Sequence, residues 1–424
     1  MGTRGMIERV LEAAALLSAR FARDGGQASR LLGEGLRALE PGLSGPVAAV
    51  FYASLRHDRK IEMLLGPDAN ADGRATLAAA IIGLIGWDET GLSPALAAAR
   101  CADISDPLER FGVEHSLPSA LAARLLLGDI SEPAALARAF LEEPPLTARA
   151  TGDRTALISA LAAAGIPGTP GRWSDRALML EIDGSVYETE AFQSGRFELQ
   201  DEGSQLIAEL VAPPPGGVVL DLCAGAGGKT LAIAALLQGK GRVIATDVHP
   251  RKLEELARRA RRAGLHNIQT AAIEGEDLPE LVERLRGKID RVLVDAPCTG
   301  LGVLRRNPEA KHRYDPASVR ELGVVQAKLL AQATALLGPG ARAIYATCSF
   351  LPEENQAPVE AALALDPELE LVSPAEVWGR ARAELLLSED RRFLALRPDR
   401  HDTDAFFAAV LRRKRPRTKP HSSP

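Results

Sequence analysis

The first 140 residues carry apolar side chains at helical spacing. Stretches rich in Ala and Leu repeat apolar positions every three or four residues, and breaks containing Gly, Pro or Asp separate them. This pattern predicts helices over Met6–Phe21, Gln27–Leu39, Pro46–Leu65, Ala75–Gly86 and Ser119–Leu127. We therefore expect residues 1–140 to form an all-helical domain, with a linker at Glu142–Pro145.

The pattern changes between residues 146 and 202. A short helical stretch, Arg154–Ala164, is followed by two strand-like runs, Ala177–Ile182 and Arg196–Gln200. Runs of this length with alternating apolar positions are typical of strands that bury one face. We expect a small α+β connector in this region, which we assign to the binding of a polymeric substrate.

From residue 203 onward, strand-like and helical segments alternate. Helical patterns at Thr230–Leu237, up to Ala263 and at Ser318–Leu337 stand between apolar runs. These runs predict strands at Val218–Leu222, Arg242–Asp247, Asn267–Ile273, Asp290–Asp295 and Ala341–Ala346. Such alternation is typical of a doubly wound, Rossmann-like parallel sheet.

The C-terminal part departs from this alternation. Arg392–Arg397 and Ala405–Leu411 are separated by only a few residues, so we expect an antiparallel hairpin rather than a helical crossover. We accordingly assign residues 203–412 to one α/β domain and residues 413–424 to a basic, disordered tail.

Composition narrows the class of protein. Apolar residues make up 46% of the 424 residues, which is enough to build full cores. The longest apolar stretch, Leu77–Trp87, is too short to cross a bilayer, and no charged-then-apolar signal segment opens the chain, so we expect a cytoplasmic location. The four cysteines include no CxxC pair, which favours free thiols over disulfides and argues against a metal site.

The net charge of −5 is unevenly distributed along the chain. Residues 1–145 hold 14 Lys and Arg against 19 Asp and Glu, whereas the remainder holds 37 of each. Binding to a polyanion would therefore depend on local basic patches. Arg305, Arg306, Lys311 and Arg313 form one such patch, and we expect them to hold phosphates of such a polyanion. The basic helix around residues 251–262 is interpreted as a solvated face.

A glycine-rich loop joins the first strand of the α/β domain to its helix. Glycines at such a turn let the backbone approach a ligand, and the helix N-terminus offers free N–H groups. The loop ends like a P-loop, but Cys223 stands where that motif needs a glycine. Asp247 closes the second strand about 20 residues later, where an acid accepts hydrogen bonds from ribose hydroxyls; it could also cap the next helix.

These features favour a nucleoside cofactor over a triphosphate. Glu274, near the end of the third strand, could accept from an adenine amino group or could be a solvated loop acid. The residues expected to line the cofactor are Cys223, Ala224, Gly225, Ala226, Gly227, Gly228, Lys229, Asp247, Glu274 and Asp295.

Two cysteines follow neighbouring strands of the same predicted sheet. Cys298 comes after the fourth strand, in Asp295-Ala-Pro-Cys298, and Cys348 directly after the fifth. Because the carboxyl ends of parallel strands line one crevice, both thiols should lie beside the cofactor loop. A thiolate that adds to carbon 6 of a cytosine makes carbon 5 nucleophilic enough to take a methyl group. Asp295 is placed to hydrogen-bond the nitrogen edge of the base.

Four motifs in the same order resemble the Nol/Nop/Sun family of RNA 5-methylcytosine methyltransferases. They are Phe197–Gln205, the loop Asp221–Thr230, Asp295–Cys298 with Arg305–Glu309, and Thr347–Ser349 with Glu353–Asn355. The resemblance covers about residues 140–412. The loop differs from the family's usual Cys-Ala-Ala-Pro-Gly-Gly-Lys in having Gly225-Ala226 at the Ala-Pro positions.

The resemblance implies S-adenosylmethionine as cofactor and RNA, ribosomal RNA in the first place, as substrate. The phosphates that Arg305, Arg306, Lys311 and Arg313 are expected to hold would then be those of RNA, and the connector at residues 146–202 would bind RNA as well. It further implies that Cys348 is the attacking nucleophile, that Cys298 assists product release, and that Asp295 belongs to the catalytic set. The helical part, with Tyr52–Arg56, is similar to NusB-like RNA-binding domains. The alternatives are the same chemistry on transfer RNA, a non-catalytic RNA-binding ribosome assembly factor, or a dehydrogenase with a dinucleotide site. We expect a monomer.

Overall fold

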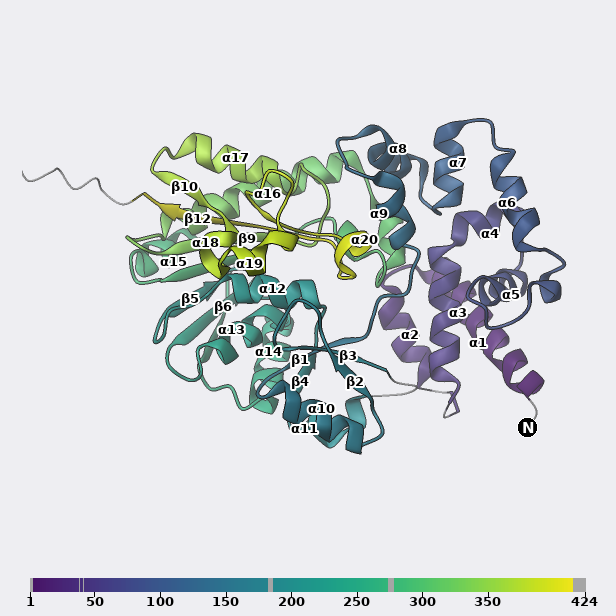
Figure 1. Ribbon diagram of the computed structural model, residues 1–424, viewed down its shortest axis with the longest axis horizontal. Coiled ribbons are helices and arrows are strands. Elements are labelled where there is room, and N and C mark those ends of the chain that lie inside the picture. The colour runs from purple at the N-terminus through teal and green to yellow at the C-terminus, as the bar shows by residue number, and fades with distance from the viewer. Residues whose placement is uncertain (1–2, 38, 41, 182–185, 274–277, 415–424) are drawn as a thin grey trace, which may run out of the picture. The chain divides into compact units, whose positions relative to one another are not determined.

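The computed structural model describes residues 3–37, 39–40, 42–181, 186–273 and 278–414. The chain folds as two compact units (Figure 1). One unit contains the residues up to Pro144 together with Val303–Asp315, and the other contains residues 145–182, 186–302 and 316 onward. A segment from the middle of the α/β region thus belongs to the N-terminal unit.

The N-terminal unit is helical, as the apolar pattern predicted. Val47, Phe51 and Leu77 lie fully buried in its core. Its elements are α1 (Thr3–Asp24), α2 (Ala28–Leu36), α3 (Ser44–Arg56), α4 (Asp58–Leu65), α5 (Ala71–Ile81), η1 (Trp87–Thr90), α6 (Pro94–Ala102), α7 (Pro107–Glu114), α8 (Ser119–Leu127), α9 (Pro133–Ala139) and, from the inserted segment, η4 (Pro308–Arg313).

Two features of this unit differ from the pattern-based prediction. The single helix expected over Pro46–Leu65 is two, because His57 leaves helical geometry between α3 and α4. Helices α6, α7 and α9 were missed, because each begins with a proline that resembles a chain break in the sequence. Proline is well suited to the first helical turn, where its missing N–H would have no partner.

The connector is a four-stranded antiparallel sheet with the order β2-β3-β1-β4, and it belongs to the same compact unit as the large sheet. Its elements are β1 (Thr147–Ala150), α10 (Arg154–Ala163), β2 (Gly168–Pro170), β3 (Ala177–Leu180), η2 (Val186–Glu188), α11 (Glu190–Gln193) and β4 (Phe197–Leu199). Both predicted connector strands are present.

The large sheet has the order β10-β12-β9-β8-β5-β6-β7, and β11 pairs with β12. Strands β5 to β9 run parallel, whereas β12 is antiparallel to β9. Its elements are α12 (Glu202–Leu210), β5 (Val218–Asp221), α13 (Gly228–Leu236), β6 (Arg242–Asp247), α14 (Pro250–Arg262), β7 (Ile268–Ala272), α15 (Leu278–Leu285), β8 (Arg291–Asp295), η3 (Leu301–Val303), α16 (Pro316–Ala335), β9 (Arg342–Thr347), α17 (Gln356–Leu365), β10 (Leu369–Val372), α18 (Pro374–Trp378), α19 (Arg380–Ala383), η5 (Glu384–Leu386), β11 (Leu394–Leu396), α20 (Pro398–His401) and β12 (Phe406–Arg413).

The doubly wound α/β fold is therefore confirmed, with two corrections at the C-terminal end. The predicted hairpin forms between β11 and β12, but the short helix α20 lies in its connection, and β10 was missed. The expected tail starts too early, because Arg413 pairs within the sheet and forms a 3.1 Å ion pair with Asp366. Residues 415–424 lie outside the described residues.

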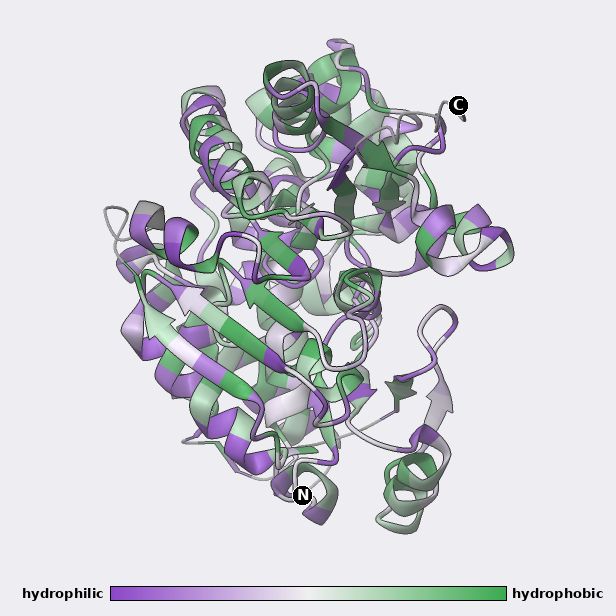
Figure 2. Cartoon of the chain, turned by 90° about the vertical axis from the view of Figure 1, so that its left-hand side faces the viewer, coloured by the Kyte–Doolittle hydropathy of each residue, from purple (hydrophilic) through white to green (hydrophobic). Residues whose placement is uncertain are grey.

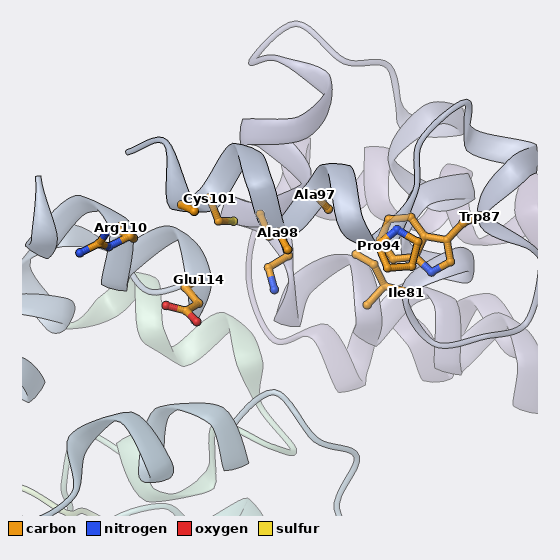
Figure 3. A pocket seen from close by; sticks show the side chains of 10 residues that line it. Ile81, Trp87, Pro94, Ala97, Ala98, Cys101, Arg110 and Glu114 are labelled. Atoms are coloured by element: carbon orange, nitrogen blue, oxygen red, sulfur yellow. The ribbon is translucent and has the colours of Figure 1, made fainter. Parts of the chain in front are cut away.

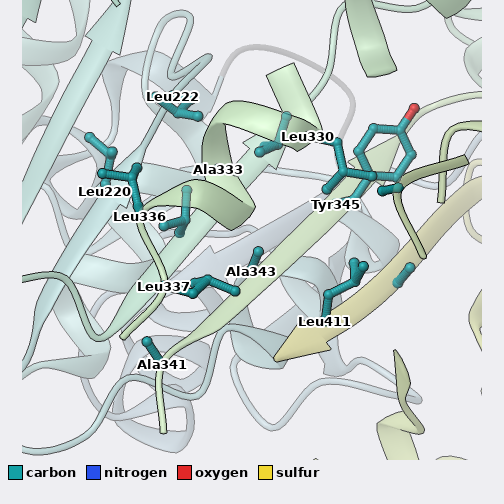
Figure 4. Packing of buried hydrophobic residues seen from close by; sticks show 14 of the residues in the cluster. Leu220, Leu222, Leu330, Ala333, Leu336, Leu337, Ala341, Ala343, Tyr345 and Leu411 are labelled. Atoms are coloured by element: carbon teal, nitrogen blue, oxygen red, sulfur yellow. The ribbon is translucent and has the colours of Figure 1, made fainter. Parts of the chain in front are cut away.

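Both faces of the large sheet are covered by helices. Leu220 and Tyr345 point to one face, where they pack against α15, α16 and α17 (Figure 4). Val219 and Ile344, the adjacent positions on β5 and β9, pack on the other face with α12 and α13. The central strands β5, β8 and β9 are accordingly apolar along most of their length, with polar residues at their ends (Figure 2), as expected for strands buried on both sides. No helix among the described residues is long and apolar enough to span a membrane.

Candidate active site

The carboxyl ends of β5, β8 and β9 bring three chemically active segments together. Strand β5 lies between β8 and β6, where the strand order reverses, and such a point is where α/β sheets bind ligands. The glycine loop leaves β5, Asp295 ends β8, and Cys348 follows Thr347 at the end of β9. The structure thus places the cofactor loop and the two thiol-bearing loops at one edge, as the sequence predicted.

The glycine loop has a backbone that needs glycine. Gly225 and Gly227 have φ angles of +54° and +90°, which side chains rarely tolerate. A Cβ at Gly227 would lie 2.4 Å from the Leu256 side chain, whereas one at Gly225 would meet no atom within 4 Å. The loop therefore packs closely on α14 on one side and leaves open space beside Gly225.

Asp247 connects this loop to the next helix. Its Oδ2 accepts a hydrogen bond from the Gly225 backbone N–H at 2.8 Å, and its Oδ1 accepts one from His249 N–H at 2.9 Å. The predicted role as a helix cap is not present, because His249 is the N-cap residue of α14 and no side chain caps that helix; Asp247 holds only the N–H of His249. The role in binding ribose hydroxyls remains a proposal, and Glu274, the expected adenine partner, lies outside the described residues.

Asp221 is a site residue that sequence reasoning missed. It is 1% exposed, and its Oδ2 accepts a hydrogen bond of 2.7 Å from Thr230 Oγ1. Burial raises its pKa to about 7, against the lowering effect of the Thr230 hydrogen bond. Its Oδ1 has no hydrogen-bond partner among the described residues. A cationic group of a ligand would supply that partner.

Arg259, on α14, is a second residue that was missed. Its Nη1 donates to the Ala226 carbonyl oxygen in the cofactor loop at 2.7 Å, and its Nη2 lies 2.9 Å from Glu198 Oε2 on β4. Arg262 pairs with the same carboxylate. The interpretation of this basic helix as a solvated face is wrong for these two arginines, and it holds for the exposed Arg258 and Arg261.

The end of β8 carries a half-buried ion pair. Lys229 Nζ, at the start of α13, lies 2.6 Å from Asp295 Oδ2. Burial would lower the pKa of Lys229, but the charge and hydrogen bond of Asp295 outweigh it and raise that pKa. Asp295 is thus paired with a cation, and 30% of its side chain is exposed, so it can still accept hydrogen bonds from a ligand.

Cys298 and Cys348 meet at this edge. Their sulfur atoms are 3.4 Å apart. The hydrogen bond with Cys348, together with burial, raises the pKa of the Cys298 thiol well above its ordinary value. Cys223 packs beside a core cluster, and burial raises the pKa of its thiol, which favours a packing role. Cys101 is buried in the helical unit.

Glu354 is a third missed residue, although its neighbourhood was part of the recognised motif. It is fully buried, and its carboxylate accepts hydrogen bonds from the loops of both thiols. No local pattern distinguishes it from its exposed neighbour Glu353.

The expected RNA-binding patch divides into buried and exposed members. Lys311 is 4% exposed, and its Nζ donates to Leu55 O at 2.8 Å and pairs with Asp58 at 2.7 Å inside the helical unit. Arg305 is 2% exposed and donates to the Glu143 carbonyl oxygen. This burial argues against phosphate contacts by both residues and corrects that expectation. Arg306 is half-buried, and Arg313 is exposed.

The helical unit also contains a cavity of about 430 Å³, lined by Lys60, Trp87, Cys101, Arg110 and Glu114 among others (Figure 3). Its charges are mixed, and nothing in the structure indicates an occupant. Among the described residues, no group of three or more His, Cys, Asp or Glu is arranged to hold a metal ion.

The edge of the large sheet fits S-adenosylmethionine. The open space beside Gly225 leaves room for a ligand. The Asp247 carboxylate offers an acceptor for ribose hydroxyls, and the buried Oδ1 of Asp221 offers one for an ammonium group. The fold and this site define the class of protein: an S-adenosylmethionine-dependent methyltransferase.

Comparisons with known proteins give the family. The family model described as 16S rRNA methyltransferase RsmB/F matches residues 208–412. A Bacillus subtilis protein named probable ribosomal RNA small subunit methyltransferase B is 32% identical over 315 residues, which cover 73% of this chain and 69% of that protein. The chain belongs to the RsmB/F family of 16S rRNA methyltransferases, which confirms the resemblance drawn from the four motifs.

Solved structures agree with the fold. The crystal structure of PH0851 matches 97% of this chain and 99% of its own with a TM-score of 0.77 at 22% identity. A methyltransferase homolog protein from Pyrococcus horikoshii matches 73% of this chain and 100% of its own with a TM-score of 0.62 at 25% identity.

Proposed function

We propose that this protein transfers a methyl group from S-adenosylmethionine to carbon 5 of a cytosine in ribosomal RNA. The observation that carries the proposal is the pair of thiols, 3.4 Å apart, beside the cofactor loop. Transfer to an oxygen or nitrogen would need no thiol, whereas carbon 5 of cytosine is too weak a nucleophile without one. Two thiols at one site also fit a reaction that must first form and then break a covalent adduct.

Cys348 is the proposed nucleophile. Its thiolate adds to carbon 6 of the base, and the electron pair of the 5,6 double bond moves to carbon 5. When bound, S-adenosylmethionine would supply the electrophilic methyl group for carbon 5 and leave as S-adenosylhomocysteine. Asp295, held by Lys229, accepts a hydrogen bond from the nitrogen edge of the cytosine and orients the ring.

Cys298 is the proposed partner for release. The methylated adduct must pass the proton on carbon 5 to a base such as a water molecule, and the electrons of that bond then re-form the double bond and expel the Cys348 thiolate. The departing thiolate takes the proton of the Cys298 thiol, and solvent then reprotonates Cys298. The sulfur of Cys298 lies close enough to that of Cys348 to act on the same base. The raised pKa of its thiol suits a group that stays protonated until this step.

RNA would be held by exposed basic side chains. Arg306 and Arg313 remain candidates for phosphate contacts because their side chains are not buried. The helical unit, with its similarity to NusB-like domains, is the proposed platform for a more distant part of the RNA. Two thiols at the cofactor site favour an enzyme over a non-catalytic assembly factor.

The test is transfer of labelled methyl from S-adenosylmethionine to small-subunit ribosomal RNA, with transfer RNA as the alternative substrate. Mapping of 5-methylcytosine in ribosomal RNA from a deletion strain, with and without the restored gene, identifies the position. One cytosine that loses its methyl group and regains it supports the proposal. Label on transfer RNA alone would support the alternative substrate, and no label above background would refute the enzyme.

A further inference from the structure

The carboxylate of Glu354 is saturated with hydrogen bonds. Its Oε1 accepts from the Thr299 backbone N–H at 2.8 Å and from Gln326 Nε2 at 3.2 Å. Its Oε2 accepts from Thr299 Oγ1 at 2.6 Å and from Ser349 Oγ at 2.5 Å. A carboxylate offers about four lone-pair positions, so all of its accepting capacity is directed at these three residues.

The donors belong to the loops that carry the two thiols. Thr299 directly follows Cys298, and Ser349 directly follows Cys348. Gln326, on α16, also donates to the carbonyl oxygen of Pro297 at 2.9 Å, so it holds the residue before Cys298 as well. One buried side chain thus connects both thiol loops.

Glu354 is itself held in place. Its carbonyl oxygen accepts a hydrogen bond of 2.5 Å from the Tyr345 hydroxyl on β9, and its N–H donates to Leu351 O at 3.1 Å. The side chain therefore starts from a fixed backbone position at the end of the sheet. An anion buried in this way is stable only while its donors stay in place, so the network resists separation of the loops.

A second contact fixes the far end of the Cys298 loop. The Gly302 N–H donates to the Cys348 carbonyl oxygen at 2.9 Å. A Cβ at Gly302 would lie 2.8 Å from that oxygen and 2.2 Å from Ala405 O. The backbone contact and the Glu354 network together hold the chain on both sides of the thiol pair.

We propose that Glu354 is a positioning residue that sets the separation of Cys298 and Cys348 by tying both thiol loops to one carboxylate. Its consequence for catalysis rests on the proposed function, because two thiols must reach adjacent carbons of one base. Its effect on the distance between the sulfurs does not rest on that function.

Substitutions of Glu354 separate geometry from charge. Glu354→Gln keeps two accepting positions for Thr299 N–H and Gln326, and its amide can donate to the hydroxyls of Thr299 and Ser349. Glu354→Ala keeps none of these contacts. Glu353→Gln, the same change at the exposed neighbouring position, is the matched control.

The first readout is thiol proximity, which needs no RNA. Oxidised glutathione converts a close thiol pair into a disulfide, with release of two reduced glutathione molecules. We expect wild type, Glu353→Gln and Glu354→Gln to close the Cys298–Cys348 disulfide at similar rates. Glu354→Ala should be slower by about a hundredfold, the order expected for displacements near 1 Å. A wild-type rate in folded Glu354→Ala overturns the proposal.

The second readout covers the case in which Glu354→Ala fails to fold. Thr299→Val and Ser349→Ala each remove one hydroxyl from the network. Thr299→Val should slow release and accumulate a protein–RNA adduct, whereas Ser349→Ala should slow attack and accumulate none. Identical phenotypes for the two variants would refute separate control of the thiol loops. Failure of the proposed function would give a different result. Wild type would then methylate no cytosine, while the disulfide rates of wild type and the Glu354 variants would still differ as expected.

Discussion

Arg259 donates a hydrogen bond from Nη1 to the backbone carbonyl oxygen of Ala226, 2.7 Å away, in the middle of the cofactor loop. Related loops have a proline at the Ala226 position, which restricts the backbone by itself. In this protein the restraint comes from a side chain on α14, which Glu198 on β4 in turn holds through a buried ion pair. The connector therefore takes part in shaping the cofactor site.

Loss of Arg259 should weaken cofactor binding. We expect Arg259→Met to lower the affinity for S-adenosylmethionine by about 1–2 kcal/mol, because a charge-assisted hydrogen bond to the loop is lost. Glu198 keeps Arg262 as a partner, so an unpaired buried anion should not dominate the result. Calorimetry measures the affinity, and Arg261→Met, at an exposed position of the same helix, is the control. Equal affinities for both variants would show that Arg259 only anchors the connector.

Asp221 should make stability depend on pH. Its folded-state pKa of about 7 lies above its ordinary value of 3.8. Between these values the folded protein holds a proton that the unfolded chain releases, so stability falls as pH rises through this window. Asp221→Asn keeps an acceptor for Thr230 and removes the titration. Without cofactor, the free energy of unfolding of wild type relative to this variant should fall by about 1–4 kcal/mol between pH 4 and pH 8. Denaturant unfolding of both proteins at the two pH values measures this. The same difference in unfolding free energy between wild type and Asp221→Asn at both pH values would contradict the prediction.

Asp247 has two roles that one substitution can distinguish. Asp247→Ala removes the acceptor for Gly225 N–H and His249 N–H and the proposed acceptor for the ribose. We expect the affinity for S-adenosylmethionine to fall by about 1–3 kcal/mol. Comparison with S-adenosylmethionine analogues that lack ribose hydroxyls separates the roles. If the Asp247→Ala substitution weakens binding of these analogues as much as it weakens binding of S-adenosylmethionine, Asp247 acts only on the loop and the helix.

Lys311 and Arg313 should behave differently, although they are two residues apart. Lys311→Met removes the buried pair with Asp58 and should destabilise the helical unit by about 3–5 kcal/mol. Arg313→Ala should leave stability unchanged and reduce the slope of RNA affinity against salt by about one unit. Thermal unfolding and filter binding at several salt concentrations measure the two effects. If folded Lys311→Met also reduces the slope of RNA affinity against salt, Lys311 contacts RNA phosphates after all.

The sequence was sufficient for the α/β fold and for the meeting of the two thiols. Apolar runs bounded by glycines locate β5, β6, β8 and β9, and the rule that parallel strands end at one edge brings Cys298 and Cys348 together. These inferences need only local patterns and a general topological rule.

What the sequence could not predict depends on distant partners. Lys311 and Asp58 are 253 positions apart, and a basic residue after a site loop has the same local pattern whether it binds RNA or supports a helix. Arg259 and Glu354 similarly gain their roles only from Ala226, Thr299 and other residues that the fold brings beside them. Strand β10 was missed because its four residues are not bounded by glycines as those of β5 are.

In the proposed mechanism, Cys348 forms the covalent bond to the cytosine and Cys298 is needed to break it. The most direct measurement is denaturing gel electrophoresis of each alanine variant after incubation with S-adenosylmethionine and labelled ribosomal RNA. Cys298→Ala should accumulate a methylated protein–RNA species that survives denaturation, whereas Cys348→Ala should bind RNA and form none. A stable adduct in Cys348→Ala and none in Cys298→Ala would contradict the account and exchange the roles of the two thiols.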